Sequence, residues 1–358
     1  MAMVQAPDEI LALRSRLNAG AWDDVVAAAN MRQLLPALGT EANRKHLTAG
    51  IPEFRSSDGR VTITLALSEG IARHQAVRAA MLDRLIELVG LLNASGMEPL
   101  LLKGARTLWT GIPGWRTMGD LDLLTPGRAV EAQAVAVRAG YTPAAGYEQP
   151  ANWHHEINLY RDDLPGWLEF HDRAAMHRAD ILLSTETLMA QSLRDSRHDG
   201  IARILPPHTD LLYCVIHHHV SHRGDKYGRL STKGLYEFAA AFADLTDAGR
   251  HELLNLAVSH PRLVAILDLW LAAAAERFRM PVPAPFSIQP DAIASWKRMS
   301  HRTGDAIGNY GGILNELRMG LSGKRLSRMP DGATWLGRQK LRWSVMSSLL
   351  SPATRKTV

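Results

Sequence analysis

The chain has 358 residues, of which 46% are hydrophobic and 22% charged, and its formal net charge is +5. This balance is typical of a soluble globular protein and excludes a disordered chain or a collagen-like fibre. The single cysteine, Cys214, excludes an internal disulfide and fits a cytoplasmic protein, and no apolar run is long enough to span a membrane. The basic balance modestly favours an anionic partner.

The first 95 residues have the pattern of helices. Apolar residues recur at intervals of three and four in "EILALRSRLNAG", "WDDVVAAANMRQLLPAL" and "LSEGIARHQAVRAAMLDRLIELVGLLNASG". Ser68 followed by Glu69 predicts the start of the last helix, and Gly96 predicts its end. We therefore expect an N-terminal helical region over residues 1–95.

After Gly96 the hydrophobic period changes. "EPLLLKG" predicts a short buried strand at residues 98–102, "ARTLWTG" a short helix and "IPGWRTMG" a loop. The alternation in "DLDLLT" predicts a second strand. "PGRAVEAQAVAVRAGY" predicts a helix with Pro126 near its first turn and Gly140 at its end. "HEINLYRDD" and "WLEFHDRA" predict two strands joined by "DLPG".

From about residue 180 we expect helices again, in "HTDLLYCVIHHHVSH", "TKGLYEFAAAFADL" and "HPRLVAILDLWLAAAAERF". The pattern predicts an α+β fold, with a small mixed sheet in a core over residues 96–180 and a C-terminal helical region over residues 181–358. That region ends in a basic tail, because nine Lys or Arg residues and one acid lie between Arg318 and Val358.

Asp120 and Asp122 are separated by one residue in "GDLDLLT". In a strand their carboxylates share one face, while Leu121 and Leu123 point into the core. Like charges this close repel unless a proton or a cation neutralises them, and Mg²⁺ is commonly held by one or two carboxylates plus substrate phosphates. The motif alone leaves a second interpretation equally open, a solvated pair at a strand end with one member capping the next helix.

A third acid, Glu169, alternates with apolar residues in "GWLEFHDR". If its strand neighbours the first, three carboxylates can hold two metal ions for in-line displacement at phosphorus, with Glu169 orienting or deprotonating the acceptor. His171 shares the face of Glu169 and could assist, although a structural role is commoner for such a histidine.

Taken together, these motifs resemble those of a known family. "PLLLKGARTLWTGIPGWRTMGDLDLLT" resembles the signature of an uncharacterised nucleotidyltransferase-like family, and the resemblance continues through "WLEFHDR" and "DLLYCVIHHHVSHRGDKYGRLSTKGLYEFAAAFADL". It spans roughly residues 20 to 245. The resemblance implies the polymerase-beta-like nucleotidyltransferase fold, with Asp120, Asp122 and Glu169 as ligands of catalytic Mg²⁺.

The resemblance also places Lys103 and Gly104 at the glycine-containing phosphate loop. Glycine lets backbone N–H groups approach phosphate, and Lys103 can neutralise its charge. Arg116 is a further phosphate candidate, with an ordinary exposed loop arginine as the equal alternative. Two departures from the superfamily pattern, Ala105 after Gly104 and glutamate as the third acid, keep a non-catalytic homologue open as an alternative.

Histidines gather in "HHHVSH", where His218 and His222 stand one helical turn apart, a spacing that can bind zinc. The glutamate of H-E-x-x-H is absent, so core hydrogen bonding or lining of the active cleft are alternatives, and the resemblance favours the cleft. In "WHHEINLY", strand alternation would send His155 away from His154 and Glu156.

The function expected from these features is Mg²⁺-dependent transfer of a nucleotidyl group from an NTP to an acceptor hydroxyl or phosphate. The acceptor class stays open among small molecules, peptides or proteins, and nucleic acids. Kinase-like transfer of the γ-phosphoryl group, a nucleotide- or partner-binding homologue and a zinc hydrolase are the alternatives. The tail "ATWLGRQKLRWSVMSSLL" reads as a basic amphipathic helix that either packs on its own protein or contacts a partner or lipid surface.

Overall fold

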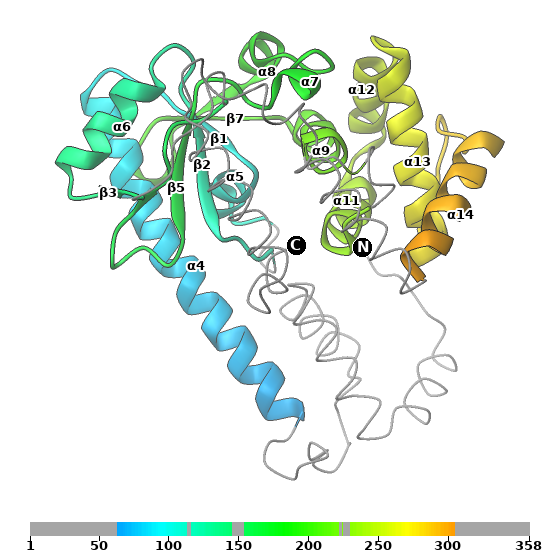
Figure 1. Cartoon of the computed structure of the whole chain (residues 1–358), viewed down its shortest axis with the longest axis horizontal. Coiled ribbons are helices and arrows are strands. Elements are labelled where there is room, and N and C mark those ends of the chain that lie inside the picture. Colours follow the sequence, from blue (N-terminus) through cyan, green and yellow to red (C-terminus); the bar gives the residue numbers. More distant parts are fainter. Residues whose placement is uncertain (1–62, 113–115, 145–153, 222–223, 225–229, 305–358) are drawn as a thin grey trace, which may run out of the picture.

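The computed structural model describes residues 63–304 except 113–115, 145–153, 222–223 and 225–229 (Figure 1). Its described part has one seven-stranded mixed sheet flanked by helices, which confirms the expected α+β class. The strands are β1 (Leu100–Leu102), β2 (Asp120–Leu124), β3 (Thr142–Pro143), β4 (Leu159–Tyr160), β5 (Trp167–His171), β6 (Leu193–Asp195) and β7 (Ala202–Ile204). Their order across the sheet is β3-β4-β5-β2-β1-β7-β6.

The helices precede, interrupt and follow this sheet. They are α4 (Ile63–Ala94), α5 (Lys103–Thr110), α6 (Ala129–Arg138), α7 (His177–Asp180), α8 (Thr185–Gln191), the short 3₁₀ turn η1 (Arg197–Asp199), α9 (Pro207–Ile216), the π-helical turn η2 (His217–Ser221), α11 (Thr232–Asp244), α12 (Asp247–Val258), α13 (Pro261–Phe278) and α14 (Pro290–Gly304). Within the described ranges, none of these helices combines the length and the apolar character that a membrane crossing requires. The predicted basic tail lies outside the described residues.

The two faces of the sheet belong to separate hydrophobic cores. Leucines such as Leu121 and Leu123 pack with α4, α5 and α6, whereas Leu102 and Leu124 pack with α9, α11 and α13. Figure 1 shows α4 and α6 on one side of the strands and α9 to α14 on the other. Because side chains alternate along a strand, Asp122 lies on the same face as Leu124, toward the C-terminal helices.

The register of β2 with its two neighbouring strands brings the predicted motifs next to one another. β2 pairs antiparallel with β1, which places Leu102 opposite Asp122, and parallel with β5, which places Asp122 opposite Glu169. The strand of the third acid is therefore the direct neighbour of the aspartate strand.

Two expectations about element bounds are wrong. Helix α4 is already helical from Ile63 and passes through Ser68, because serine is tolerated inside a helix as well as at its start. The sheet also does not end before residue 180, since β6 and β7 form an antiparallel pair and β7 lies parallel to β1. These three-residue strands carry too little alternation to be recognised. The division of the chain into three regions stays a prediction, although the sheet continues to Ile204.

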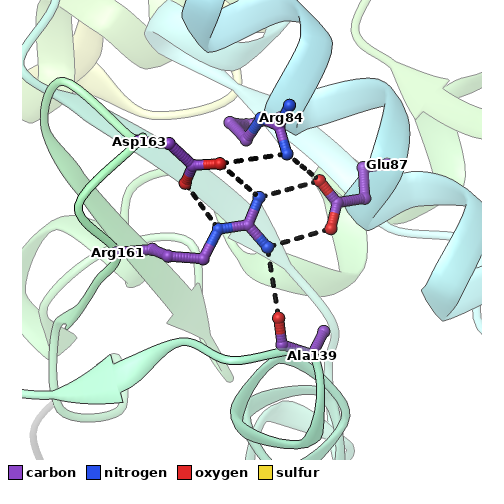
Figure 2. A network of polar contacts seen from close by, with 5 residues as sticks. All are labelled: Arg84, Glu87, Ala139, Arg161 and Asp163. Carbon is purple, nitrogen blue, oxygen red and sulfur yellow. Dashed lines mark hydrogen bonds and ion pairs between the residues drawn. The ribbon is translucent and has the colours of Figure 1, made fainter.

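The turn between β4 and β5 is anchored to α4 (Figure 2). Arg161 donates two hydrogen bonds to Glu87, at 2.9 and 2.8 Å, and one to the carbonyl of Ala139 at 3.1 Å. It also pairs with Asp163 at 2.6 Å, and Arg84 contacts both acids. A network of several charges contributes more to stability than an isolated surface ion pair. This network therefore fixes the position of the turn from which β5 begins.

Gly166 lies immediately before β5, directly against Gly119, the residue before β2. Its φ is +154°, and an added Cβ would lie 2.5 Å from the carbonyl oxygen of Gly119. We expect Gly166→Ala to lower the free energy of unfolding by about 2–4 kcal/mol, as measured by urea denaturation. Gly90→Ala is the control, because its Cβ would meet nothing within 4 Å and it should be neutral or slightly stabilising. A Gly166→Ala variant as stable as wild type would contradict the close approach.

Candidate functional site

The predicted site residues lie together where β1, β2 and β5 are neighbours in the sheet. β2 supplies Asp120 and Asp122, and β5 supplies Glu169 and His171. Lys103 follows β1 directly as the first residue of α5, next to the position opposite Asp122. The common face of these side chains follows from strand alternation, as the sequence predicts.

Asp122 is the centre of the site, and none of its surface is exposed. Its Oδ1 accepts a hydrogen bond from Lys103 Nζ at 2.7 Å and lies 3.0 Å from His171 Nε2. Its Oδ2 is buried and has no hydrogen-bond partner within the described part of the chain. Burial works to raise the pKa of Asp122, but the Lys103 ammonium and the His171 hydrogen bond outweigh it and hold the pKa well below its usual range.

Glu169 faces Asp122 from the neighbouring strand. Its Oε1 accepts a hydrogen bond from Asn158 Nδ2 at 2.8 Å, and its Oε2 lies 3.5 Å from His171 Nε2. Burial works to raise the pKa of Glu169, but the hydrogen bond from His171 prevails and lowers it. For His171, burial works to lower the pKa, while both carboxylates raise it above its usual value. His171 therefore bridges the two acids.

Asp122, Glu169 and His171 form a group that could hold a metal ion. One potential ligand atom from each lies within 4.8 Å of the others, in a search of the described residues. The buried Oδ2 of Asp122 leaves an anionic oxygen available for a cation, and Glu169 adds a second. Carboxylate oxygens suit Mg²⁺ and Mn²⁺, and the neutral form of the His171 imidazole could add a nitrogen ligand. The residues present thus fit a divalent cation.

Asp120 lies on the same face, two residues before Asp122, but is not a member of that group. The charge of Asp122, and then burial, raise the pKa of Asp120 to about 6. The repulsion expected between the two aspartates is therefore present, while the role of Asp120 as a metal ligand stays a prediction.

Lys103 and Gly104 open helix α5 beside the acids. Lys103 has a positive φ of 45°, and its ammonium pairs with Asp122. A Cβ on Gly104 would lie 3.0 Å from Met118 Cβ and 3.3 Å from the carbonyl oxygen of Asp120. Glycine therefore lets α5 pack closely against the start of β2, and phosphate binding by this pair stays a prediction.

Arg116 is not an exposed loop residue, because only 9% of its surface is accessible. Its guanidinium lies 3.3 Å from Glu237 on α11 and donates to Thr107 Oγ1 at 3.1 Å. From the same helix, Lys233 donates to the carbonyl of Thr117 at 2.9 Å. These contacts tie the loop before β2 to α5 and α11. Phosphate binding by Arg116 stays a prediction.

The rings of His154 and His155, before β4, lie closer together than the sequence predicts. The rings of His154 and His155 lie 4.7 Å apart between centroids, and both lie near His171, at 5.3 and 5.1 Å. The expectation that alternation separates them is wrong because His155 forms an isolated bridge with His171 and the residues after it are irregular until Leu159.

The later histidines lie on a different element. Helix α9 continues into a π-helical turn, in which His218 packs on α11 so closely that a Cβ on Gly234 would lie 3.1 Å from its ring. The ring of His218 is also 6.2 Å from that of Trp270 on α13. His218 is not a member of the group around Asp122, and His222 lies outside the described residues, so their joint role stays a prediction.

Two residues of the site were not predicted. Asn158 holds Glu169, and its position follows once the β4–β5 register pairs Leu159 with Leu168. Glu237 binds Arg116 from α11, and its only local signal is its four-residue spacing from Lys233. Such partners become visible only when strands and helices are placed in space.

Comparisons with known proteins agree with the resemblance noted in the motifs. No curated protein and no solved structure matches the chain. A family model described as an uncharacterised nucleotidyltransferase matches residues 18–279, which is more than half of the sequence and includes every residue of the site. The chain therefore belongs to this uncharacterised nucleotidyltransferase family.

Proposed function

We propose that the protein is a Mg²⁺-dependent nucleotidyltransferase that moves a nucleotidyl group from an NTP to an acceptor hydroxyl or phosphate and releases pyrophosphate. The observation that carries the proposal is the strand register that sets the fully buried Asp122 on β2 opposite the largely buried Glu169 on β5. Membership of a nucleotidyltransferase family supports a transferase, and a carboxylate cluster is suited to hold a cation against phosphate.

In this proposal Asp120, Asp122 and Glu169 hold the cation, and a site for two ions is expected from three carboxylates. Bound Mg²⁺ would supply charge neutralisation for the triphosphate and a more acidic acceptor hydroxyl. Glu169 orients the acceptor and accepts its proton, while His171 keeps Glu169 and Asp122 in place through its contacts of 3.5 and 3.0 Å. The oxygen–phosphorus bond forms at the α-phosphorus as the bond to pyrophosphate breaks.

Lys103 has a double role in the same scheme. Its ammonium neutralises Asp122 at 2.7 Å, which lets the protein fold with a buried carboxylate before any ligand arrives. With a cation to neutralise Asp122, Lys103 would not be needed as its partner, and its charge would be available to phosphate oxygens. Lys103 follows β1 directly as the first residue of α5, and the family resemblance expects a phosphate-binding turn at this point, which supports the proposal.

The proposal is tested with NTPs labelled at either the α or the γ position, Mg²⁺ and separate small-molecule, peptide and nucleic-acid acceptor pools. We expect transfer of α-label by wild type and its loss in Glu169→Gln. Asp247→Asn, an exposed acid on α12, is the matched control and should behave as wild type. Transfer of γ-label alone would instead support a kinase, and nucleotide binding without any transfer would support a binding protein.

A further inference from the structure

An exposed aromatic pair lies beside the candidate metal centre. Trp167 is the first residue of β5 and is the register partner of Asp120 on β2. Tyr160, the last residue of β4, meets Trp167 edge to face, with ring centroids 6.1 Å apart. Trp167 and Tyr160 are 44% and 40% exposed, whereas tryptophan is highly buried on average.

Both rings lie on the face of the sheet that carries the acids. Leu168 and Leu159 are completely buried in the core formed with α4, α5 and α6. Alternation along each strand therefore directs Trp167 and Tyr160 to the opposite face, where Glu169 also lies. Trp167 precedes Glu169 by two residues, which is about 7 Å along a strand.

The position of Trp167 is firmly set by the backbone around it. Its N–H donates to the carbonyl of Gly119 at 2.9 Å, and Gly166 allows the two chains to approach this closely. The preceding turn is held to α4 by Arg161 and Glu87 (Figure 2). An exposed tryptophan on such a rigid support is preorganised to receive a flat ligand.

We propose that Trp167 stacks the base of the bound nucleotide, with Tyr160 supporting the tryptophan ring edge-on. The inference rests on the proposed function, because the phosphates must lie at Asp122 and Glu169. A ribose then bridges the distance of about 7 Å from that point to Trp167. Stacking on one ring accepts any base, since every base has a π-face.

A nucleobase fits this surface better than a protein partner. Two rings offer only a small apolar area, and the register partner of Trp167 is the charged Asp120. A stable protein interface needs a much larger patch than two side chains. The acids beside the rings would hold phosphate through a cation, so the aromatic surface receives the uncharged end of the same ligand.

The test compares binding of ATP with binding of inorganic tripolyphosphate, which has the phosphates without the base, by calorimetry in Mg²⁺. We expect Trp167→Ala to weaken ATP binding about 5- to 150-fold and to leave tripolyphosphate binding within about twofold. Trp167→Phe should retain most of the ATP affinity. Leu193→Ala on β6 is the control, because Leu193 is also an exposed apolar strand residue.

Three other outcomes would each overturn the inference, and the pattern of ATP and tripolyphosphate binding tells them apart. Equal ATP binding by wild type and Trp167→Ala would remove the stacking role and leave the proposed function intact. Equal losses for ATP and tripolyphosphate would mean that the substitution disturbs the phosphate site rather than the base. A wild-type protein that binds neither ligand would remove the proposed function and the stacking site together.

Discussion

Asp122→Asn is expected to reduce nucleotidyl transfer by on the order of a thousandfold or more. The substitution keeps the size of the side chain but removes the buried negative charge to which the cation would bind. A bound metal contributes several kcal/mol to stabilising charge in the transition state, and each 1.36 kcal/mol is about tenfold in rate. The measurement is pyrophosphate release at saturating NTP, together with a titration of Mn²⁺ or Mg²⁺ binding. Undiminished transfer would contradict the assignment of Asp122.

The same substitution should also destabilise the fold, for a separate reason. It leaves the Lys103 ammonium, whose side chain is 14% exposed, facing a neutral amide. Removing one partner of a buried ion pair costs about 3–5 kcal/mol, and the amide oxygen that still accepts a hydrogen bond favours the lower end of this range.

A double variant separates these two effects. Lys103→Met combined with Asp122→Asn removes the unpaired charge, so we expect it to recover much of the lost stability in urea denaturation without recovering activity. Stability that stays low in the double variant would show that Asp122 supports the fold through contacts other than its ion pair with Lys103.

The three strands that build the site could be predicted because their patterns are local. "LLL" is entirely apolar and is followed by Lys-Gly, and "DLDLL" and "WLEFH" alternate, so each pattern predicts a buried strand. Since alternation also fixes the face, the sequence could place Asp122 and Glu169 together once their strands were taken as neighbours. The family motif supported that neighbourhood, and the register confirms it.

The remaining features depend on contacts that no local pattern encodes. β6 and β7 are only three residues long, and their pairing with each other and with β1 makes them strands. Lys103 meets Asp122 because the antiparallel register sets Leu102 opposite Asp122, a fact that sequence spacing does not contain. The grouping of His154 and His155 around His171 likewise depends on irregular backbone, in which alternation fails.

Asp120→Asn is expected to make the cation-free protein more stable at neutral pH while it impairs transfer. The charge of Asp122, and then burial, raise the pKa of Asp120 to about 6, from a usual value of 3.8. Because the folded state binds the proton more tightly than the unfolded state, folding stability contributed by this group falls as pH rises from about 4 to 6. Above pH 6 the ionised Asp120 therefore costs stability, by about 1–2 kcal/mol after allowance for solvent screening.

Asparagine cannot carry this charge, so the two proteins should diverge with pH. Thermal unfolding without divalent cations should give matching stabilities near pH 4 and a more stable Asp120→Asn variant near pH 7.5. Added Mg²⁺ should stabilise wild type more than the variant, because the cation relieves repulsion that asparagine lacks. A cation-free variant that is less stable than wild type at pH 7.5 would instead make Asp120 a structural residue. A variant that is more stable than wild type but transfers less would show that the negative charge of Asp120 serves cation binding at a cost in folding stability.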